Sequence, residues 1–364
     1  MTDSLPHRPH EAFAGASIDT AVIPTARTAT CVRWIAGRDR SEPVVFLHGN
    51  ISSSLFFFPL MAHLPRRFRP IALDLRGFGG SDPDPVDATR GVRDFSDDVL
   101  AALDALHLGR AHVVGWSLGG AVAMQAVIDA PERFSSLTLI APVSPFGFGG
   151  TIDAEGRMLA PDGAGSGAGM VSPKFVQALA NGDTSSENRS GPRALLRRAY
   201  VAPGWDGEGE EELLAGMLST VVGPDNYPGD VARSESWPFF APGTRGVMNA
   251  IAPTNLELTD LVEVEPKPPV LWLRGNGDVV ISDASSMDPA APSRTGAIAG
   301  YPGPEVAPPQ PMIAQTRAVL DAFAERGGRY REVVIGGAGH APYLEKLPVT
   351  LEALVPHLDG AEKE

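Results

Sequence analysis

AHVVGWSLGGAVA, residues 111–123, joins a short apolar run to an apolar helical pattern through the turn GWSLGG. A serine framed by glycines between a strand and a helix is the G-x-S-x-G pattern of a nucleophile elbow. The glycines are needed because side chains two residues before and after Ser117 would collide with the neighbouring strand and helix. The helix that begins at Leu118 also aims its unpaired N–H groups at the serine. We therefore predict that Ser117 is a nucleophile.

Short β-rich runs recur along the chain and alternate with helical patterns. The runs are VVFL at 44–47, IALDL at 71–75, HVVG at 112–115, LTLI at 137–140, VLWL at 270–273 and REVVI at 331–335. The helical patterns cover 54–64, 95–106, 118–130, 311–326 and 343–357. Runs this short are typical of strands in a parallel sheet. We predict an α/β fold in which a mostly parallel, eight-stranded sheet is covered by helices on both faces.

The alternation stops in two segments, which we expect to lie outside the sheet. Residues 144–253 are rich in Gly, Pro and charge, and they predict an inserted, mainly helical cap. Its expected helices are 173–180, 192–200 and 208–222. The core would then comprise residues 1–143 and 254–364. The second segment, 279–310, has many prolines and no periodic element, and a loop of that length is usually functional or mobile.

Composition narrows the class of protein. The 364 residues include 30 Lys and Arg against 44 Asp and Glu, a net charge of −14, which argues against a nucleic-acid-binding surface. The single cysteine, Cys31, cannot form an internal disulfide or a thiolate metal site. No stretch approaches the ~18 consecutive apolar residues of a membrane span. We expect a cytoplasmic protein that acts on a small molecule without nucleic acid or membrane, and the sequence leaves its oligomeric state open.

A serine nucleophile needs a base, and the base needs an acid that orients it. Of the eight histidines, only His48 and His340 fall in loops that follow strands. His340 lies after the last strand, at the edge where ligands collect in open α/β sheets, so we predict that it is the base. His48 is expected to support its loop. Asp278, in a tight turn after a strand, is the predicted acid, and Asp283 and Asp288 are alternatives in the long loop that follows.

Backbone N–H groups near the serine are expected to form an oxyanion hole. The N–H of Leu118 is one candidate by position. The second is the N–H of Asn50, in the loop after the strand at 44–47, where Gly49 lets the chain turn. The N–H of Ile51 is the alternative to that of Asn50.

Four aromatic residues are candidates for contact with substrate: Phe56, Trp116, Trp237 and Phe240. Phe56 begins a helical pattern and is equally compatible with ordinary core packing. Trp237 and Phe240 belong to the apolar stretch SWPFFAPGTRGVMNAI at 236–251, which could dock the cap on the core or form the ceiling of a substrate cavity.

Five motifs together resemble the α/β-hydrolase fold family. They are VVFLHGN at 44–50, DLRGFGGSD at 74–82, GWSLGG at 115–120, LRGNGD at 273–278 and GAGHAPYLE at 337–345. Their order along the chain is that of the family, and the resemblance implies a serine hydrolase with a cap. The long Pro-rich loop after Asp278 and the Gly- and Pro-rich cap depart from the family pattern.

The leading hypothesis is an esterase that hydrolyses carboxylic esters of small to medium, largely apolar substrates through an acyl-enzyme. The same triad would also serve a carbon–carbon bond hydrolase or a proline-selective aminopeptidase. An epoxide hydrolase or haloalkane dehalogenase is disfavoured because Ser117 stands where those reactions need a carboxylate. A non-catalytic ligand-binding receptor is disfavoured because all three triad positions are filled. No metal or organic cofactor is expected, since the histidine spacing lacks H-E-x-x-H or another zinc pattern.

Overall fold

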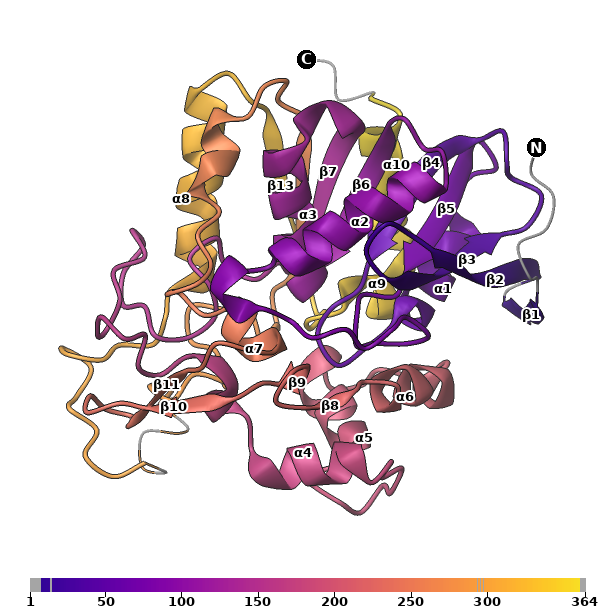
Figure 1. Cartoon of the computed structure of the whole chain (residues 1–364). Coiled ribbons are helices and arrows are strands. Elements are labelled where there is room, and N and C mark those ends of the chain that lie inside the picture. The colour runs from indigo at the N-terminus through magenta and orange to yellow at the C-terminus, as the bar shows by residue number, and fades with distance from the viewer. Residues whose placement is uncertain (1–7, 14, 293, 295, 297, 361–364) are drawn as a thin grey trace.

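The protein is built around a single large sheet (Figure 1). The computed structural model describes residues 8–13, 15–292, 294, 296 and 298–360. The strands are β1 (Arg8–Phe13), β2 (Ala16–Pro24), β3 (Ala29–Ile35), β4 (Glu42–Leu47), β5 (Phe68–Leu73), β6 (Ala111–Trp116), β7 (Phe134–Ile140), β12 (Val270–Gly275) and β13 (Tyr330–Ile335). Their order in the sheet is β1-β2-β3-β5-β4-β6-β7-β12-β13.

The predicted fold class is confirmed, with one strand more than the expected eight. All neighbours from β5 to β13 pair in parallel, whereas β1, β2, β3 and β5 pair antiparallel. The ninth strand arises because β1 extends the antiparallel β2–β3 hairpin at the sheet edge. All six predicted runs are parallel strands. Every residue of β6 is buried, as expected for a central strand covered on both faces.

Helices cover both faces of this sheet. Figure 1 shows α2 (Arg93–Ala105) and α3 (Leu118–Asp129) in front of the strands and α10 (Leu347–Leu358) behind them. α1 (Phe58–His63) and α9 (Pro342–Glu345) pack with α10, and α8 (Met312–Glu325) stands at the β13 side. The five helical predictions are confirmed, with two interruptions. Residues Ser54–Phe57 form a 3-10 turn before α1, and Lys346 separates α9 from α10.

The segment between β7 and β12 lies at one end of the sheet, below it in Figure 1. Its helices are α4 (Pro173–Ala180), α5 (Pro192–Leu195), α6 (Glu210–Leu218) and α7 (Val247–Ala250), and a π-helical turn (Leu196–Tyr200) continues α5. It also holds β8 (Val222–Gly223), β9 (Tyr227–Pro228), β10 (Val231–Arg233) and β11 (Phe240–Pro242). The sequence predicts the first three helices but not these short strands, because two or three residues carry no periodicity. The described residues of 279–310 contain neither helix nor strand, as expected.

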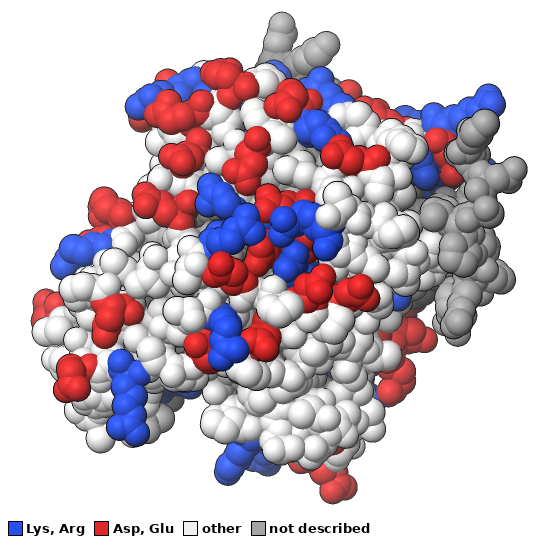
Figure 2. Space-filling model, in the orientation of Figure 1, with Lys and Arg blue, Asp and Glu red and all other residues white. Residues whose placement is uncertain are grey.

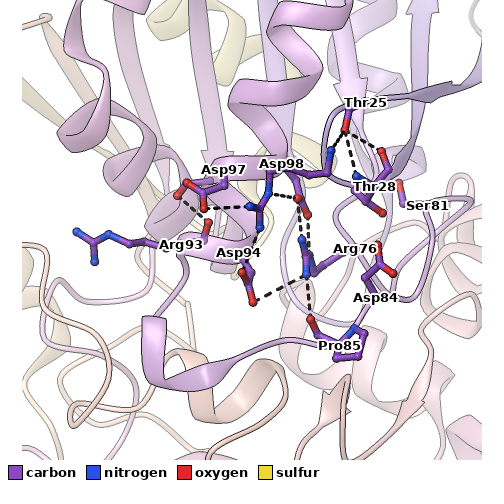
Figure 3. A network of polar contacts seen from close by, with 12 residues as sticks. Thr25, Thr28, Arg76, Ser81, Asp84, Pro85, Arg93, Asp94, Asp97 and Asp98 are labelled. Carbon is purple, nitrogen blue, oxygen red and sulfur yellow. Dashed lines mark hydrogen bonds and ion pairs between the residues drawn. The ribbon is translucent and has the colours of Figure 1, made fainter.

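Charged side chains of both signs intermingle on the face seen in Figure 2. The polar network in Figure 3 joins α2 to two loops. Arg76, from the loop after β5, donates to both carboxylate oxygens of Asp98 at 2.6 and 2.7 Å, and Arg27 donates to Asp98 at 2.9 Å. A second α2 carboxylate, Asp94, accepts the N–H of Asp87 at 2.8 Å. Because Arg76 and Asp98 are both buried, their ion pair fixes the loop after β5 to helix α2.

None of the helices in the described ranges is both long and apolar enough to cross a lipid bilayer.

Candidate active site

Ser117 occupies a strained turn between β6 and α3. Its φ of 55° and ψ of −116° lie outside the regions that L-residues normally adopt. The neighbouring glycines permit this turn through close packing. A Cβ on Gly115 would lie 2.2 Å from the carbonyl oxygen of Gly119, and a Cβ on Gly119 would lie 2.1 Å from that of Leu47. The glycines therefore have the steric role expected from the sequence, and the turn presents Ser117 to a cavity.

His340 and Asp278 form a buried pair at the ends of two neighbouring strands. Nδ1 of His340 lies 2.8 Å from Oδ2 of Asp278, and both side chains are almost fully buried. The other oxygen of Asp278 accepts the N–H groups of Val280 at 2.7 Å and Ile281 at 3.0 Å. The carboxylate is thus held by its own turn. When Nδ1 donates its hydrogen to Asp278, Nε2 is the nitrogen that can accept a proton.

The two alternative acids have other partners. Asp283 accepts N–H groups in the first turn of α8 at 2.8 and 3.1 Å. Asp288 accepts two backbone N–H groups of its own loop at 2.7 and 2.9 Å, and burial raises its pKa. In the described part of the chain no hydrogen bond or ion pair joins either residue to His340. The structure therefore brings Asp278, and neither alternative, to the histidine.

The loop after β4 carries the second predicted oxyanion donor. Asn50 and Leu118 both line the cavity that Ser117 faces. The N–H of Ile51 donates to the side-chain oxygen of Asn50 at 3.0 Å, so that N–H is already engaged. This favours Asn50 over Ile51 as the donor. Gly49 lets the loop approach the serine, since a Cβ there would lie 3.0 Å from Cβ of Ser117.

His48 and Asp74 support the loop after β4. His48 is fully buried, with Nδ1 2.7 Å from its neighbour's carbonyl oxygen, and Nε2 accepts the N–H of Leu75 at 3.0 Å. Burial lowers its pKa, which fits the neutral, structural histidine that the sequence suggests. Burial alone would raise the pKa of Asp74, but the charge of Arg33 and the hydrogen bonds from Gly80 and Ser54 outweigh it and hold the pKa at about 2.

Phe56 and Trp116, two predicted substrate contacts, lie behind the site. Both are fully buried and neither lines the cavity. Trp116 stacks on Phe56 with ring centroids 5.3 Å apart, and its Nε1 donates to the carbonyl oxygen of His340 at 2.8 Å. Trp116 thus supports the histidine loop from the core, and the structure does not bring Trp116 or Phe56 to the cavity wall.

Trp237 and Phe240 are likewise not among the residues that line the cavity. Trp237 packs on Tyr301, with ring centroids 5.1 Å apart, in a separate apolar cluster. Phe240 lies in the β10–β11 hairpin and covers Gly169, where an added Cβ would lie 2.4 Å from its ring. Trp237 therefore packs against the loop after Asp278, and Phe240 packs within 144–253. Of residues 236–251, only Met248 and Ile251 line the cavity.

The cavity has a volume of about 500 Å³ and a largely apolar wall. Besides the predicted site residues it is lined by Val143, Phe148, Met170, Val171, Ser172, Phe175, Leu195, Arg198, Tyr200, Tyr227, Met248, Ile251, Val280, Ile281, Ser286, Met287 and Arg294. Most of these come from 144–253 and from the loop after Asp278. The sequence did not identify them because neither segment has a periodic pattern that shows which side chains face inward.

Tyr200 links the elements around the cavity. Its hydroxyl donates to the carbonyl oxygen of Asn50 at 2.7 Å, and its own carbonyl oxygen accepts the N–H of Ala341 at 2.8 Å. Its ring packs edge-on against Trp116, with centroids 5.3 Å apart. Tyr200 thus connects the predicted oxyanion loop with the histidine loop, and nothing in its sequence context singles it out.

Glu345 makes a second tie between the segments. Its carboxylate accepts the N–H of Ala202 at 2.6 Å and that of Gly339 at 2.7 Å. Burial raises the pKa of this carboxyl group. Glu345 therefore links Ala202, two residues after the π-helical turn, to Gly339, the residue before His340.

Comparison with known proteins agrees with this fold. Residues 42–170 match the model of a protein family described as alpha/beta hydrolase fold. A 2-hydroxy-6-oxo-6-phenylhexa-2,4-dienoate hydrolase from Rhodococcus sp. strain RHA1 superposes with a TM-score of 0.58, covering 94% of this chain and 99% of that one at 18% identity. The protein has the α/β-hydrolase fold. The esterase RhEst1 from Rhodococcus sp. ECU1013 superposes on this protein with a TM-score of 0.57. The superposition covers 97% of this chain and 98% of that one, at 19% identity.

Curated relatives match this protein over shorter stretches than the solved structures do. An uncharacterized carboxylesterase nap from Bacillus subtilis is 32% identical over 112 residues, 30% of this chain and 37% of that protein. A putative carbamate hydrolase RutD from Variovorax paradoxus is 39% identical over 107 residues, 29% and 40% of the two proteins. The matched stretch spans about two fifths of the length of these relatives.

Within the described residues of this α/β-hydrolase fold, no group of three or more His, Cys, Asp or Glu side chains is placed to hold a metal ion.

Proposed function

We propose that this protein is a serine hydrolase of carboxylic esters. The observation that carries the proposal is that Ser117, on its strained turn, and His340, backed by Asp278, line one cavity. The carboxylesterase name of one curated relative and the esterase title of one structural neighbour support the same reaction class.

The mechanism follows from the positions of these groups. Oγ of Ser117 attacks the ester carbonyl while Nε2 of His340 takes its proton, and Asp278 stabilises the imidazolium that forms. The N–H groups of Asn50 and Leu118 hold the oxyanion, and each such donor contributes about 3 to 4 kcal/mol to the transition state. His340 then protonates the departing alcohol. Water activated by the same histidine attacks the acyl-enzyme, and the acid is released.

Residues 144–253 would act as a cap over a core formed by 1–143 and 254–364. The cap supplies much of the cavity wall, and its apolar character suits a small to medium, largely apolar substrate. A proline-selective aminopeptidase is less well supported, because a substrate amine would need a carboxylate and the lining residues include no Asp or Glu.

The direct test is labelling of the purified protein by a fluorophosphonate together with turnover of an ester panel. We expect Ser117→Ala to lose both the label and at least about 1,000-fold in kcat. Ser172→Ala is the matched control, because Ser172 lines the same cavity but does not lie on the elbow, and it should keep the label. Turnover or labelling that survives in Ser117→Ala would end the proposal. Vinylogous diketones in the panel would reveal a carbon–carbon bond hydrolase.

A further inference from the structure

The cavity that Ser117 faces carries positive charge on an otherwise apolar wall. Arg198, from the π-helical turn, and Arg294, from the loop after Asp278, both line it. None of the described residues that line it is Asp or Glu, although the chain contains 44 acidic residues and has a net charge of −14. The sign of charge at the cavity is therefore opposite to that of the protein as a whole, and both arginines belong to segments outside the sheet.

Neither guanidinium is neutralised by an ion pair. Among the described residues, neither Arg198 nor Arg294 forms an ion pair with a carboxylate. By contrast, Arg193 and Arg197 of the same segment both form ion pairs with glutamates. Arg198 donates to the carbonyl oxygen of Arg189 at 3.0 Å, and Arg294 donates to that of Met287. Each contact uses Nη1 alone, and a guanidinium has five N–H donors, so donors remain on both side chains.

The two arginines also lie close enough to influence each other. Burial lowers the pKa of Arg294, the charge of Asp288 opposes that shift, and the positive charge of Arg198 adds to it. Among the described residues Asp288 forms no hydrogen bond or ion pair with either guanidinium, and its two oxygens each accept a backbone N–H group. Arg198 is exposed and Arg294 is half-buried. Two like charges beside an apolar cavity are unfavourable, and an anion bound by both would relieve their repulsion and the cost of burying Arg294.

We propose that Arg198 and Arg294 bind a carboxylate group of the substrate, so that the preferred esters are those that carry a second, ionised carboxyl group. This inference rests on the proposed ester hydrolysis, and it narrows the substrate class to half-esters of dicarboxylic acids and related ester acids. The planar guanidinium matches the two oxygens of a carboxylate, and the apolar wall would pack the carbon chain between the two polar ends of such a molecule.

The test compares pairs of substrates that differ only in charge. Mono-4-nitrophenyl esters of succinate to suberate are measured beside the same esters with the free carboxylate replaced by a carboxamide. We expect the carboxylate to exceed its carboxamide partner in kcat/KM by at least about tenfold at the best chain length, since a hydrogen bond to a charged group is the stronger kind. The ratio should fall between 0.05 and 0.5 M salt, because added ions screen a partly exposed charge.

Variants then assign the preference to the two side chains. Arg294→Gln and Arg198→Gln should each lower the carboxylate-to-carboxamide ratio about threefold or more, and Arg294→Lys should retain part of it because the charge stays. Arg233→Gln is the matched control, since it removes the same charge from an exposed position on β10 that does not line the cavity. It should leave the ratio unchanged. A wild-type ratio near one, or a ratio that neither glutamine variant lowers, overturns the inference.

Binding to Ser117→Ala separates this inference from the proposed function. We expect calorimetry to show that adipate binds this variant more tightly than adipamide, and that Arg294→Gln in the same background reduces the difference. Equal binding of the two compounds would contradict the carboxylate site even if wild-type ester hydrolysis is intact. Ester turnover that survives in Ser117→Ala would contradict the proposed function and leave the binding comparison valid.

Discussion

The Tyr200 hydroxyl offers a sharp test of how the predicted oxyanion loop is held. It donates to the carbonyl oxygen of Asn50 at 2.7 Å, and Asn50 is the residue whose N–H is proposed to bind the oxyanion. Tyr200 is 6% exposed, and burial raises the pKa of its phenol, so the hydroxyl stays protonated and remains a donor. Tyr200→Phe removes this hydrogen bond and leaves the ring packing against Trp116 in place.

The size of the effect follows from a single hydrogen bond. A buried acceptor that loses its only protein donor costs about 1 to 3 kcal/mol, and water in the cavity can replace part of the lost bond at the Asn50 carbonyl. We therefore expect the free energy of unfolding to fall by about 1 kcal/mol. Complete loss of one oxyanion donor costs about 100-fold or more in kcat, so a loosened Asn50 should cost about tenfold, with KM changing little.

Tyr343→Phe is the matched control for this variant. Tyr343 is also fully buried and stacks on Phe57 at 5.1 Å, but its hydroxyl has no hydrogen-bond partner among the described residues. Removing it should leave kcat unchanged and leave stability equal or slightly higher, because an unpaired polar group is lost. Urea unfolding and steady-state kinetics on one ester measure both variants. Wild-type kcat in Tyr200→Phe, or an equal loss in Tyr343→Phe, would refute the reasoning.

Two further predictions concern the supports of the site. The lowered pKa of Asp74 means that its stabilisation is present above its unfolded pKa near 4 and is lost as pH falls toward 2, by about 2 kcal/mol. Asp74→Asn should lack this part of the acid dependence in thermal unfolding. It should also lose about 3 kcal/mol at pH 7, because Arg33, whose side chain is 16% exposed, loses its carboxylate partner; an unchanged acid profile would contradict this. Gly119→Ala should abolish fluorophosphonate labelling and lower the melting temperature, since its Cβ would lie 2.1 Å from the Leu47 oxygen. Gly109→Ala, with no atom within 4 Å of the new Cβ, should do neither, and a labelled Gly119→Ala protein would show that the elbow tolerates the clash.

The inner parallel strands β4, β6, β7 and β12 could be predicted because they are largely buried on both faces and are therefore mostly apolar. The edge strand β13 is less buried, with Ile335 alone fully inside. β2 could not be predicted, since its exposed and buried positions do not alternate regularly. The placement of His340 and Asp278 agrees with the sequence prediction for a similar reason. Both lie in short glycine-containing turns directly after strands, and the sheet fixes where such turns meet.

The cavity wall could not be predicted in the same way. Aromatic residue type alone does not tell whether a side chain faces a cavity or the core, and Phe56 and Trp116 are buried in each other behind the site. Arg198 and Tyr200, which do line the cavity, lie in a turn without apolar periodicity. Which of their atoms face the cavity depends on how that segment packs against the histidine loop and the predicted oxyanion loop. Such packing depends on the tertiary structure and leaves no local pattern in the sequence.

One turn of five residues joins the proposed carboxylate site to the predicted oxyanion loop. The π-helical turn Leu196–Tyr200 presents Arg198 and Tyr200 to the same cavity. A π-helical turn has more residues per turn than an α-helix, and such turns occur often at functional sites. Because Tyr200 is fixed at both ends, by Asn50 and by Ala341, the turn cannot shift toward an anion at Arg198 without pulling on the predicted oxyanion loop. A substrate carboxylate at Arg198 would therefore affect kcat as well as KM, whereas a simple anchoring charge would affect KM alone.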